Sequence, residues 1–180
     1  MYQEYHRILA PIDGSEEAEL AFKKAVHVAK RNQAKLIITH VIDTRALQTM
    51  NGPDNHYDDE LVQQAKRVLG EYENYASQVG LKDVETVIDY GSPKVQIAKE
   101  LAEKYHIDLI MVGATGLNAV ERLFIGSVSE YVIRNSPCDV LVVRTDLDNQ
   151  CYGEKKTKRN RKHTKKPAPA GFFICQAYII

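Results

Sequence analysis

Apolar residues follow two patterns along the first 145 residues. Short, almost unbroken apolar runs, typical of strands covered on both faces, occupy residues 7–12, 35–42, 84–90, 109–112 and 139–144. Between them, apolar residues recur every three or four positions, which predicts helices over residues 16–32, 58–79, 93–105 and 127–135. Residues 43–57, with Asn51, Gly52 and Pro53, are predicted to be a loop.

Strands that alternate with helices predict an α/β fold with a single doubly wound parallel sheet of five strands and helices on both faces, because right-handed crossovers are strongly favoured. We assign this domain to residues 1–145. In such sheets, ligands bind beyond the carboxyl ends of the strands, where the winding direction reverses.

The turn after the first strand combines Asp13, Gly14 and Ser15. Ser15 is a suitable N-cap for the following helix, because its hydroxyl can accept from a free backbone amide, and acidic residues follow in the first helical turn. Ser92 and Pro93 give a second cap and a proline at the first helical position.

The stretch from residue 109 to residue 130 has the spacing G-x2-G-x9-G-S, formed by Gly113, Gly116, Gly126 and Ser127. Glycines there let the backbone come close to a ligand or take a positive φ. Ser127 is predicted to cap the next helix, and Ser129 adds a second hydroxyl among its free amides. A loop that ends on a helix N-terminus suits a phosphate, although the glycines could also serve only the turns.

Several motifs in order resemble the ATP-binding branch of the universal stress protein family. They are residues 8–15, 40–41, 91–93, 108–113, 126–131 and 137–144, so the resemblance spans residues 7–144. It implies the strand order 3-2-1-4-5, with Asp13 and Gly113 ending the two central strands at the switch point, and it implies ATP as the ligand and a homodimer.

In that arrangement the glycine loop and the helix start would hold the phosphates, and Asp13 would bind a Mg2+ ion that the phosphate oxygens also coordinate. The Val41 backbone would meet adenine, and apolar residues would line the slot. The expected nucleotide site comprises Pro11, Ile12, Asp13, Val41, Met111, Gly113, Thr115, Gly116, Gly126, Ser127, Val128 and Ser129.

Other interpretations stay open for individual residues. Asp13 also suits a plain turn or capping residue. His40, in an apolar strand, is typical of a hydrogen-bonded core histidine. Cys138 reads as a structural thiol at a strand start. Glu121 and Arg122 suit a solvated face, with Arg122 also able to reach a phosphate.

Catalytic motifs do not emerge from the sequence: no Ser-His-Asp or Cys-His set can be assembled, and no Walker A lysine follows the glycines. We therefore interpret the chain as an ATP-binding stress-response regulator. A slow ATPase and a nucleotide-independent dimeric adaptor are the alternatives.

Composition predicts a cytoplasmic protein, because no apolar run approaches the ~18 residues of a membrane span and residues 1–7 lack a signal-peptide core. Three cysteines without C-x-x-C pairing indicate neither a disulfide framework nor a zinc site.

The zero net charge divides into −7 over residues 1–148 and +7 over residues 149–180. An acidic domain binds nucleic acid poorly. The tail over residues 146–180 is too basic to bury and is expected to be disordered. Its origin stays open between an artefact and a tether to nucleic acid or another anionic surface.

The last strand predicts assembly. Residues 139–144 are almost wholly apolar and, in the implied order, lie at a sheet edge. Two copies pairing these edges around a two-fold axis would satisfy both, so we expect a homodimer through this strand.

Overall fold

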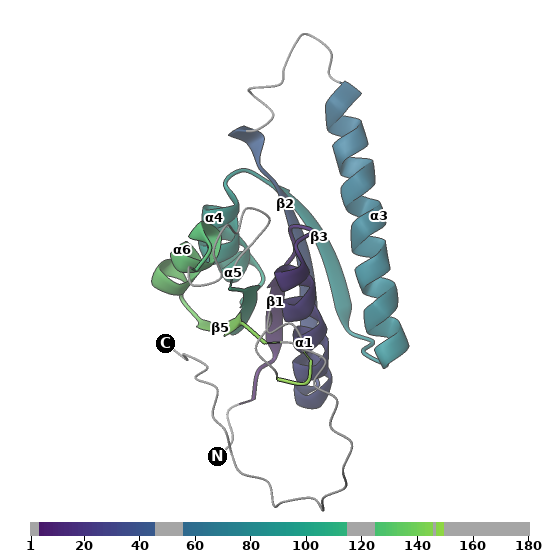
Figure 1. The fold of residues 1–180 in the computed structure, drawn as a ribbon, viewed down its shortest axis with the longest axis vertical. Helices are drawn as coiled ribbons and strands as arrows, with labels where there is room; N and C mark the ends of the chain where they lie inside the picture. Colours follow the sequence, from purple (N-terminus) through teal and green to yellow (C-terminus); the bar gives the residue numbers. More distant parts are fainter. Residues whose placement is uncertain (1–3, 46–55, 115–124, 146, 150–180) are drawn as a thin grey trace, which may run out of the picture.

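A parallel five-stranded sheet in the order β3-β2-β1-β4-β5 forms the centre of the molecule (Figure 1). The computed structural model describes residues 4–45, 56–114, 125–145 and 147–149. Its strands are β1 Arg7–Pro11, β2 Lys35–Ile42, β3 Val84–Tyr90, β4 Leu109–Gly113 and β5 Asp139–Val143. The predicted fold class and strand order are confirmed.

Helices cover both faces of this sheet. On one face, α1 (Glu16–Asn32) and α3 (His56–Val79) bury a core around Phe22, Ile8 and Ile38. On the other, α4 (Pro93–Val95), η1 (Gln96–Glu100), α5 (Leu101–Lys104) and α6 (Ser127–Asn135) form a layer whose core includes Leu101 and Ile110. The continuous apolar runs of the central strands are thus explained by burial on two faces.

Several predicted elements differ from the structure in their bounds or helix type. Helix α3 begins at His56, so the last two residues of the predicted loop are helical. The helix predicted over residues 93–105 is interrupted by the π-helical segment η1, where the Leu101 amide donates to the Gln96 carbonyl. Apolar periodicity cannot distinguish that single wider turn from an α-helix. The first strand ends at Pro11 and the last at Val143, each one residue earlier than predicted.

Candidate functional site

The switch point lies where β1 and β4 run side by side, in the register Ile8 with Leu109 and Leu9 with Ile110. The chain beyond β4 returns to this place, because the Gly126 amide donates to the Ala114 carbonyl at 2.7 Å. The start of α6 is therefore held against the carboxyl end of β4, as the phosphate-loop hypothesis requires. Thr115 and Gly116, together with Glu121 and Arg122, lie outside the described residues.

Gly113 is required by packing within the chain. A Cβ atom at this position would lie 2.8 Å from the Glu17 carbonyl carbon and 2.9 Å from the Glu17 Cβ. Among the glycines that the structure describes, three others have a positive φ angle and Gly113 does not. The close backbone approach predicted for this glycine is thus made by the first turn of α1, which crosses directly over the end of β4.

Ser129 joins the same contact from the opposite layer. Its side chain is buried, and its hydroxyl donates to the Gly113 carbonyl at 2.8 Å. A phosphate oxygen only accepts hydrogen bonds, so this hydroxyl proton is already used. What Ser129 can offer an anion is its backbone amide.

The first turn of α6 differs from the prediction in one respect: its N-cap is Gly126, with φ −61° and ψ 148° and no side-chain cap, and Ser127 is the first helical residue. The prediction that Ser127 caps the helix is wrong, because the extended residue lies one position earlier. The helical bonds begin with the Glu130 amide donating to the Gly126 carbonyl at 2.8 Å. The amides of Ser127, Val128 and Ser129 precede that bond and have no acceptor within the helix. Such a turn attracts an anion.

Asp13 lies exposed in the turn after β1 and orders the start of α1. Its Oδ1 accepts from the Ser15 amide at 2.9 Å and from the Ser15 hydroxyl at 2.6 Å. Ser15 Oγ in turn accepts from the Ala18 amide at 3.2 Å, which confirms Ser15 as the N-cap. The turn interpretation of Asp13 is therefore correct for Oδ1, whereas Oδ2 accepts no hydrogen bond from the described residues.

A metal site built from protein alone is not present in the described part of the chain, where no three His, Cys, Asp or Glu side chains converge. Toward the residues that the structure describes, Asp13 has one carboxylate oxygen without a hydrogen-bond donor. Mg2+ commonly takes one or two carboxylates and completes its shell with phosphate oxygens and water. The residues therefore fit a Mg2+ that arrives with a nucleotide and do not fit a resident ion.

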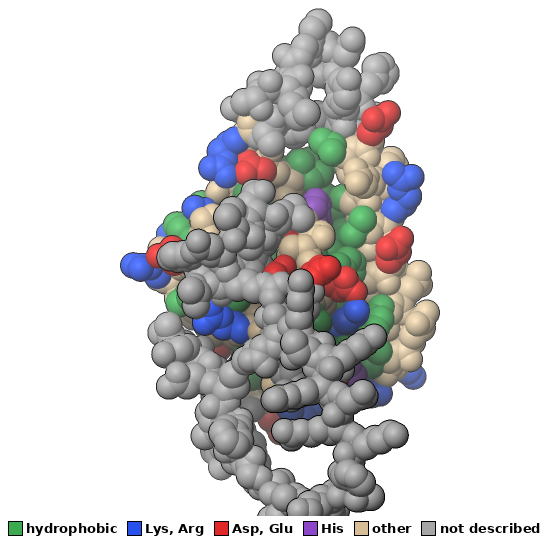
Figure 2. Space-filling model, viewed as in Figure 1, with side chains coloured by type: hydrophobic (Ala, Val, Ile, Leu, Met, Phe, Trp, Pro, Cys, Tyr) green, Lys and Arg blue, Asp and Glu red, His purple; other side chains and the backbone are tan. Residues whose placement is uncertain are grey.

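Negative charge surrounds the N-terminus of α1. Its first turn carries Glu16, Glu17 and Glu19, and acidic side chains gather in the middle of the face drawn in Figure 2. The pKa of Tyr72 on α3 is raised, mainly by burial and further by the charges of Glu19, Asp13 and Glu71. These carboxylates offset the positive end of the α1 dipole and repel an anion. A phosphate is therefore better placed at the N-terminus of α6 than at that of α1.

The apolar residues predicted to line the base slot fall into two groups. Ile12 and Met111 are buried in the core beneath α1, with exposed fractions of 3% and 0%. Pro11 and Val41 are only half-buried. A base could therefore contact Pro11 and Val41 directly, while Ile12 and Met111 support the floor beneath it.

Cys138 is half-buried at the start of β5. Burial, followed by the charges of Asp139 and Asp108, raises the pKa of its thiol to about 11. A thiol with so little thiolate at neutral pH is a poor nucleophile, which supports the structural interpretation.

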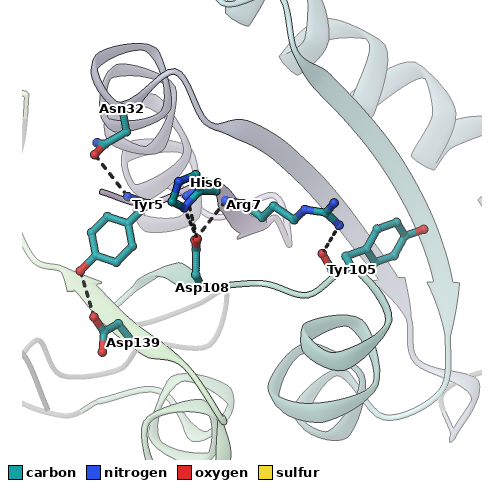
Figure 3. Close-up of polar contacts among 7 residues, drawn as sticks. All are labelled: Tyr5, His6, Arg7, Asn32, Tyr105, Asp108 and Asp139. Atoms are coloured by element: carbon teal, nitrogen blue, oxygen red, sulfur yellow. Dashed lines mark hydrogen bonds and ion pairs between the residues drawn. The ribbon is translucent and has the colours of Figure 1, made fainter. Parts of the chain in front are cut away.

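A polar cluster at the amino ends of the strands was not predicted from the sequence (Figure 3). Asp108 accepts from the His6 amide at 2.7 Å and the Arg7 amide at 3.0 Å. The Tyr5 hydroxyl donates to Asp139 at 3.0 Å. An acidic residue just before an apolar strand was the available signal. Ligands of such sheets bind at the carboxyl ends of the strands. We therefore interpret this cluster as structural, because its hydrogen bonds attach the N-terminal segment to the sheet.

Comparison with known proteins agrees with this geometry. The model of the universal stress protein family matches residues 4–144. A universal stress protein of Staphylococcus aureus strain USA300 is 51% identical over 142 residues, which cover 79% of this chain and 86% of the relative.

Solved structures show the same likeness. The universal stress protein UspA from Lactobacillus plantarum has a TM-score of 0.66 and 32% identity over 79% of this chain and 100% of its own. The protein MJ0577 has a TM-score of 0.70 and 33% identity over 78% and 96%. A universal stress protein solved in complex with cAMP has a TM-score of 0.59 and 28% identity over 78% and 98%.

Proposed function

We propose, from the premise that this chain belongs to the universal stress protein family, that it binds ATP with Mg2+ at the carboxyl ends of β1 and β4 and acts as a cytoplasmic stress-response regulator. The observation that carries the proposal is the uncapped first turn of α6, held at the end of β4 by the Gly126 amide and the Ser129 hydroxyl. The cAMP complex of one similar protein adds support for a nucleotide as the ligand class.

The roles follow from the contacts of each group. The amides of Ser127, Val128 and Ser129 donate to phosphate oxygens, and we propose phosphate binding also for Thr115 and Gly116, which lie outside the described residues. Asp13 Oδ2 binds the Mg2+ ion, while Oδ1 keeps the turn in place. The Val41 backbone and the Pro11 ring meet the base. A slow ATPase is the enzymatic alternative, and a measurement of ATP turnover separates it from a regulator that only binds the nucleotide.

Calorimetric titration with ATP and Mg2+ tests the binding. Gly126 has backbone angles that any residue adopts, so Gly126→Val removes space at the phosphate without backbone strain. This variant and Gly116→Val should abolish ATP binding and leave the circular dichroism spectrum unchanged. Gly70→Ala on α3, with open space around it, is the matched control. Unchanged affinity in both substituted variants would refute the proposal.

The metal role has its own test. In Asp13→Asn the amide oxygen still accepts from Ser15, so the turn survives, but the charge on the second oxygen is lost. ATP binding should weaken mainly when Mg2+ is present. Equal losses with and without Mg2+ would reduce Asp13 to a turn residue.

We also propose a homodimer through β5, which lies at the edge of the sheet. An apolar edge strand normally pairs or is covered, and two copies of β5 can pair around a two-fold axis. The partly buried Val142 lies within this strand. Val142→Lys should give monomers by light scattering with native helicity. A dimer that persists would place the interface elsewhere.

Two further proposals concern the rest of the chain. No helix of the described residues is long and apolar enough to cross a membrane, and the cytoplasmic setting stays a prediction. The basic tail, almost wholly outside the described residues, stays a candidate tether to an anionic surface.

A further inference from the structure

His40 on β2 forms a hydrogen bond that fixes which of its ring nitrogens carries a proton. Its Nδ1 lies 3.0 Å from the carbonyl oxygen of Ile12. A carbonyl oxygen can only accept, so Nδ1 must be the donor. In the neutral ring Nδ1 then carries the proton, and Nε2 is bare.

The Ile12 carbonyl occupies a particular place in the sheet. The Ile12 amide donates to the Thr39 carbonyl at 2.8 Å, one step beyond the last β1 pair, Pro11 with Thr39. In a parallel ladder, a residue that donates to one carbonyl accepts from the amide two residues further along the same partner strand. For Ile12 that amide belongs to Val41.

The structure breaks the ladder at this point. The backbone bond from the Val41 amide to the Ile12 carbonyl is not among those the described residues form, and the His40 ring takes the carbonyl in its place. The Val41 amide points to the same side of β2 as the Thr39 carbonyl, toward β1. It therefore faces the end of β1 without its ladder acceptor.

We propose that His40 is a positioning residue of the nucleotide site, which occupies the Ile12 carbonyl and thereby leaves the Val41 amide free to donate to a ring nitrogen of the base. The inference rests on the proposed function for its ligand, although the arrangement of His40, Ile12 and Val41 can be tested without one. A purine offers acceptor nitrogens at its edge, so an unpaired strand amide is a suitable partner.

The first test needs no variant and no nucleotide. The nitrogen chemical shifts of the His40 ring, measured by NMR in the full chain at a pH where the ring is neutral, distinguish the two tautomers. We expect the proton on Nδ1, opposite to the preference of a free histidine side chain. A proton on Nε2 would overturn the proposal.

The second test compares two substitutions. In His40→Asn the side-chain amide nitrogen can take the place of Nδ1, so the Ile12 carbonyl stays occupied. His40→Leu removes the donor, and the Val41 amide should then pair with Ile12 and exchange its proton with solvent at least about tenfold more slowly than in the native chain. Equal protection of Val41 in the native chain and in His40→Leu would overturn the proposal.

Nucleotide affinity completes the test. His40→Leu should weaken ATP binding about tenfold, the equivalent of one hydrogen bond, and His40→Asn should stay within about twofold of the native chain. His27→Asn, at an exposed position of α1, is the matched control. Equal losses in the Leu and Asn variants would overturn the positioning role. If the native chain fails to bind ATP, the proposed function falls, while the tautomer and exchange results still decide the role of His40.

Discussion

Gly113→Ala tests whether this glycine serves the packing of α1 or only the ligand. The substitution adds one methyl group, whose carbon would lie 2.8 Å from the Glu17 carbonyl carbon and 2.9 Å from the Glu17 oxygen. Both of these atoms belong to the backbone of α1, which is packed on the sheet. Neither can move away as the end of a flexible side chain would. The end of β4 and the first turn of α1 must separate.

The magnitude follows from the contact distance. Ordinary contacts begin near 3.4 Å, so the two elements must part by about 0.6 Å. Overpacking of this kind costs about 1–3 kcal/mol. Alanine also loses less chain entropy than glycine on folding, which returns ~0.5–1 kcal/mol. The two terms together give a net cost of about 0–2.5 kcal/mol, so we expect Gly113→Ala to lower the free energy of unfolding by roughly 1 kcal/mol.

Urea unfolding followed by circular dichroism measures this change in the absence of nucleotide. Gly70→Ala is the matched control, because Gly70 lies within α3 and an added Cβ meets nothing within 4 Å. That variant should be more stable than the native chain by ~0.5–1 kcal/mol. The two glycine substitutions should thus shift the midpoint in opposite directions.

A Gly113→Ala protein as stable as the native chain would refute the packing argument. If such a protein also lost ATP binding, the glycine would be needed by the ligand and not by α1. Glu17→Ala keeps the carbonyl group and the Cβ that the added methyl meets, so its effect on stability should add to that of Gly113→Ala, and strong non-additivity would count against a contact with the helix backbone.

Three further predictions concern single contacts. Ser129→Ala leaves the buried Gly113 carbonyl without its donor and should lower the free energy of unfolding by about 1–2 kcal/mol in the same assay; no change would mean that water replaces the hydroxyl. Cys138, with its thiol pKa raised from 9.0 to about 11, should react with iodoacetamide about a hundredfold more slowly at pH 8 than an exposed thiol of ordinary pKa, as measured by peptide mapping; equal rates at all cysteines would contradict the burial argument. The pKa of Tyr5 is raised above 10.0, by burial and by its bond to Asp139, so the stability that its neutral phenol provides is complete below pH 10 and lost as the pH rises through the folded-state pKa. The stability difference between the native chain and Tyr5→Phe should therefore shrink above pH 10. A difference that stays constant with pH would show that ionisation of the Tyr5 phenol does not affect stability.

Apolar periodicity was sufficient to predict the order of strands and helices along the chain. Burial on one or two faces produces a repeat of apolar residues that can be recognised within each segment by itself. Ser15 was likewise predictable as an N-cap, since its partners, the Ala18 amide and Asp13, lie within three residues. Family resemblance added the order of strands that the structure confirms.

Contacts between distant segments were decided by tertiary structure alone. The sequence marks Gly113 as special, but only the packed fold shows that the backbone of Glu17, almost a hundred residues earlier, is what excludes a side chain there. The partner of the His40 ring, the Ile12 carbonyl on the neighbouring strand segment, was decided in the same way. A local pattern specifies which face is buried, whereas the atoms that meet across that face depend on how separate elements settle against one another.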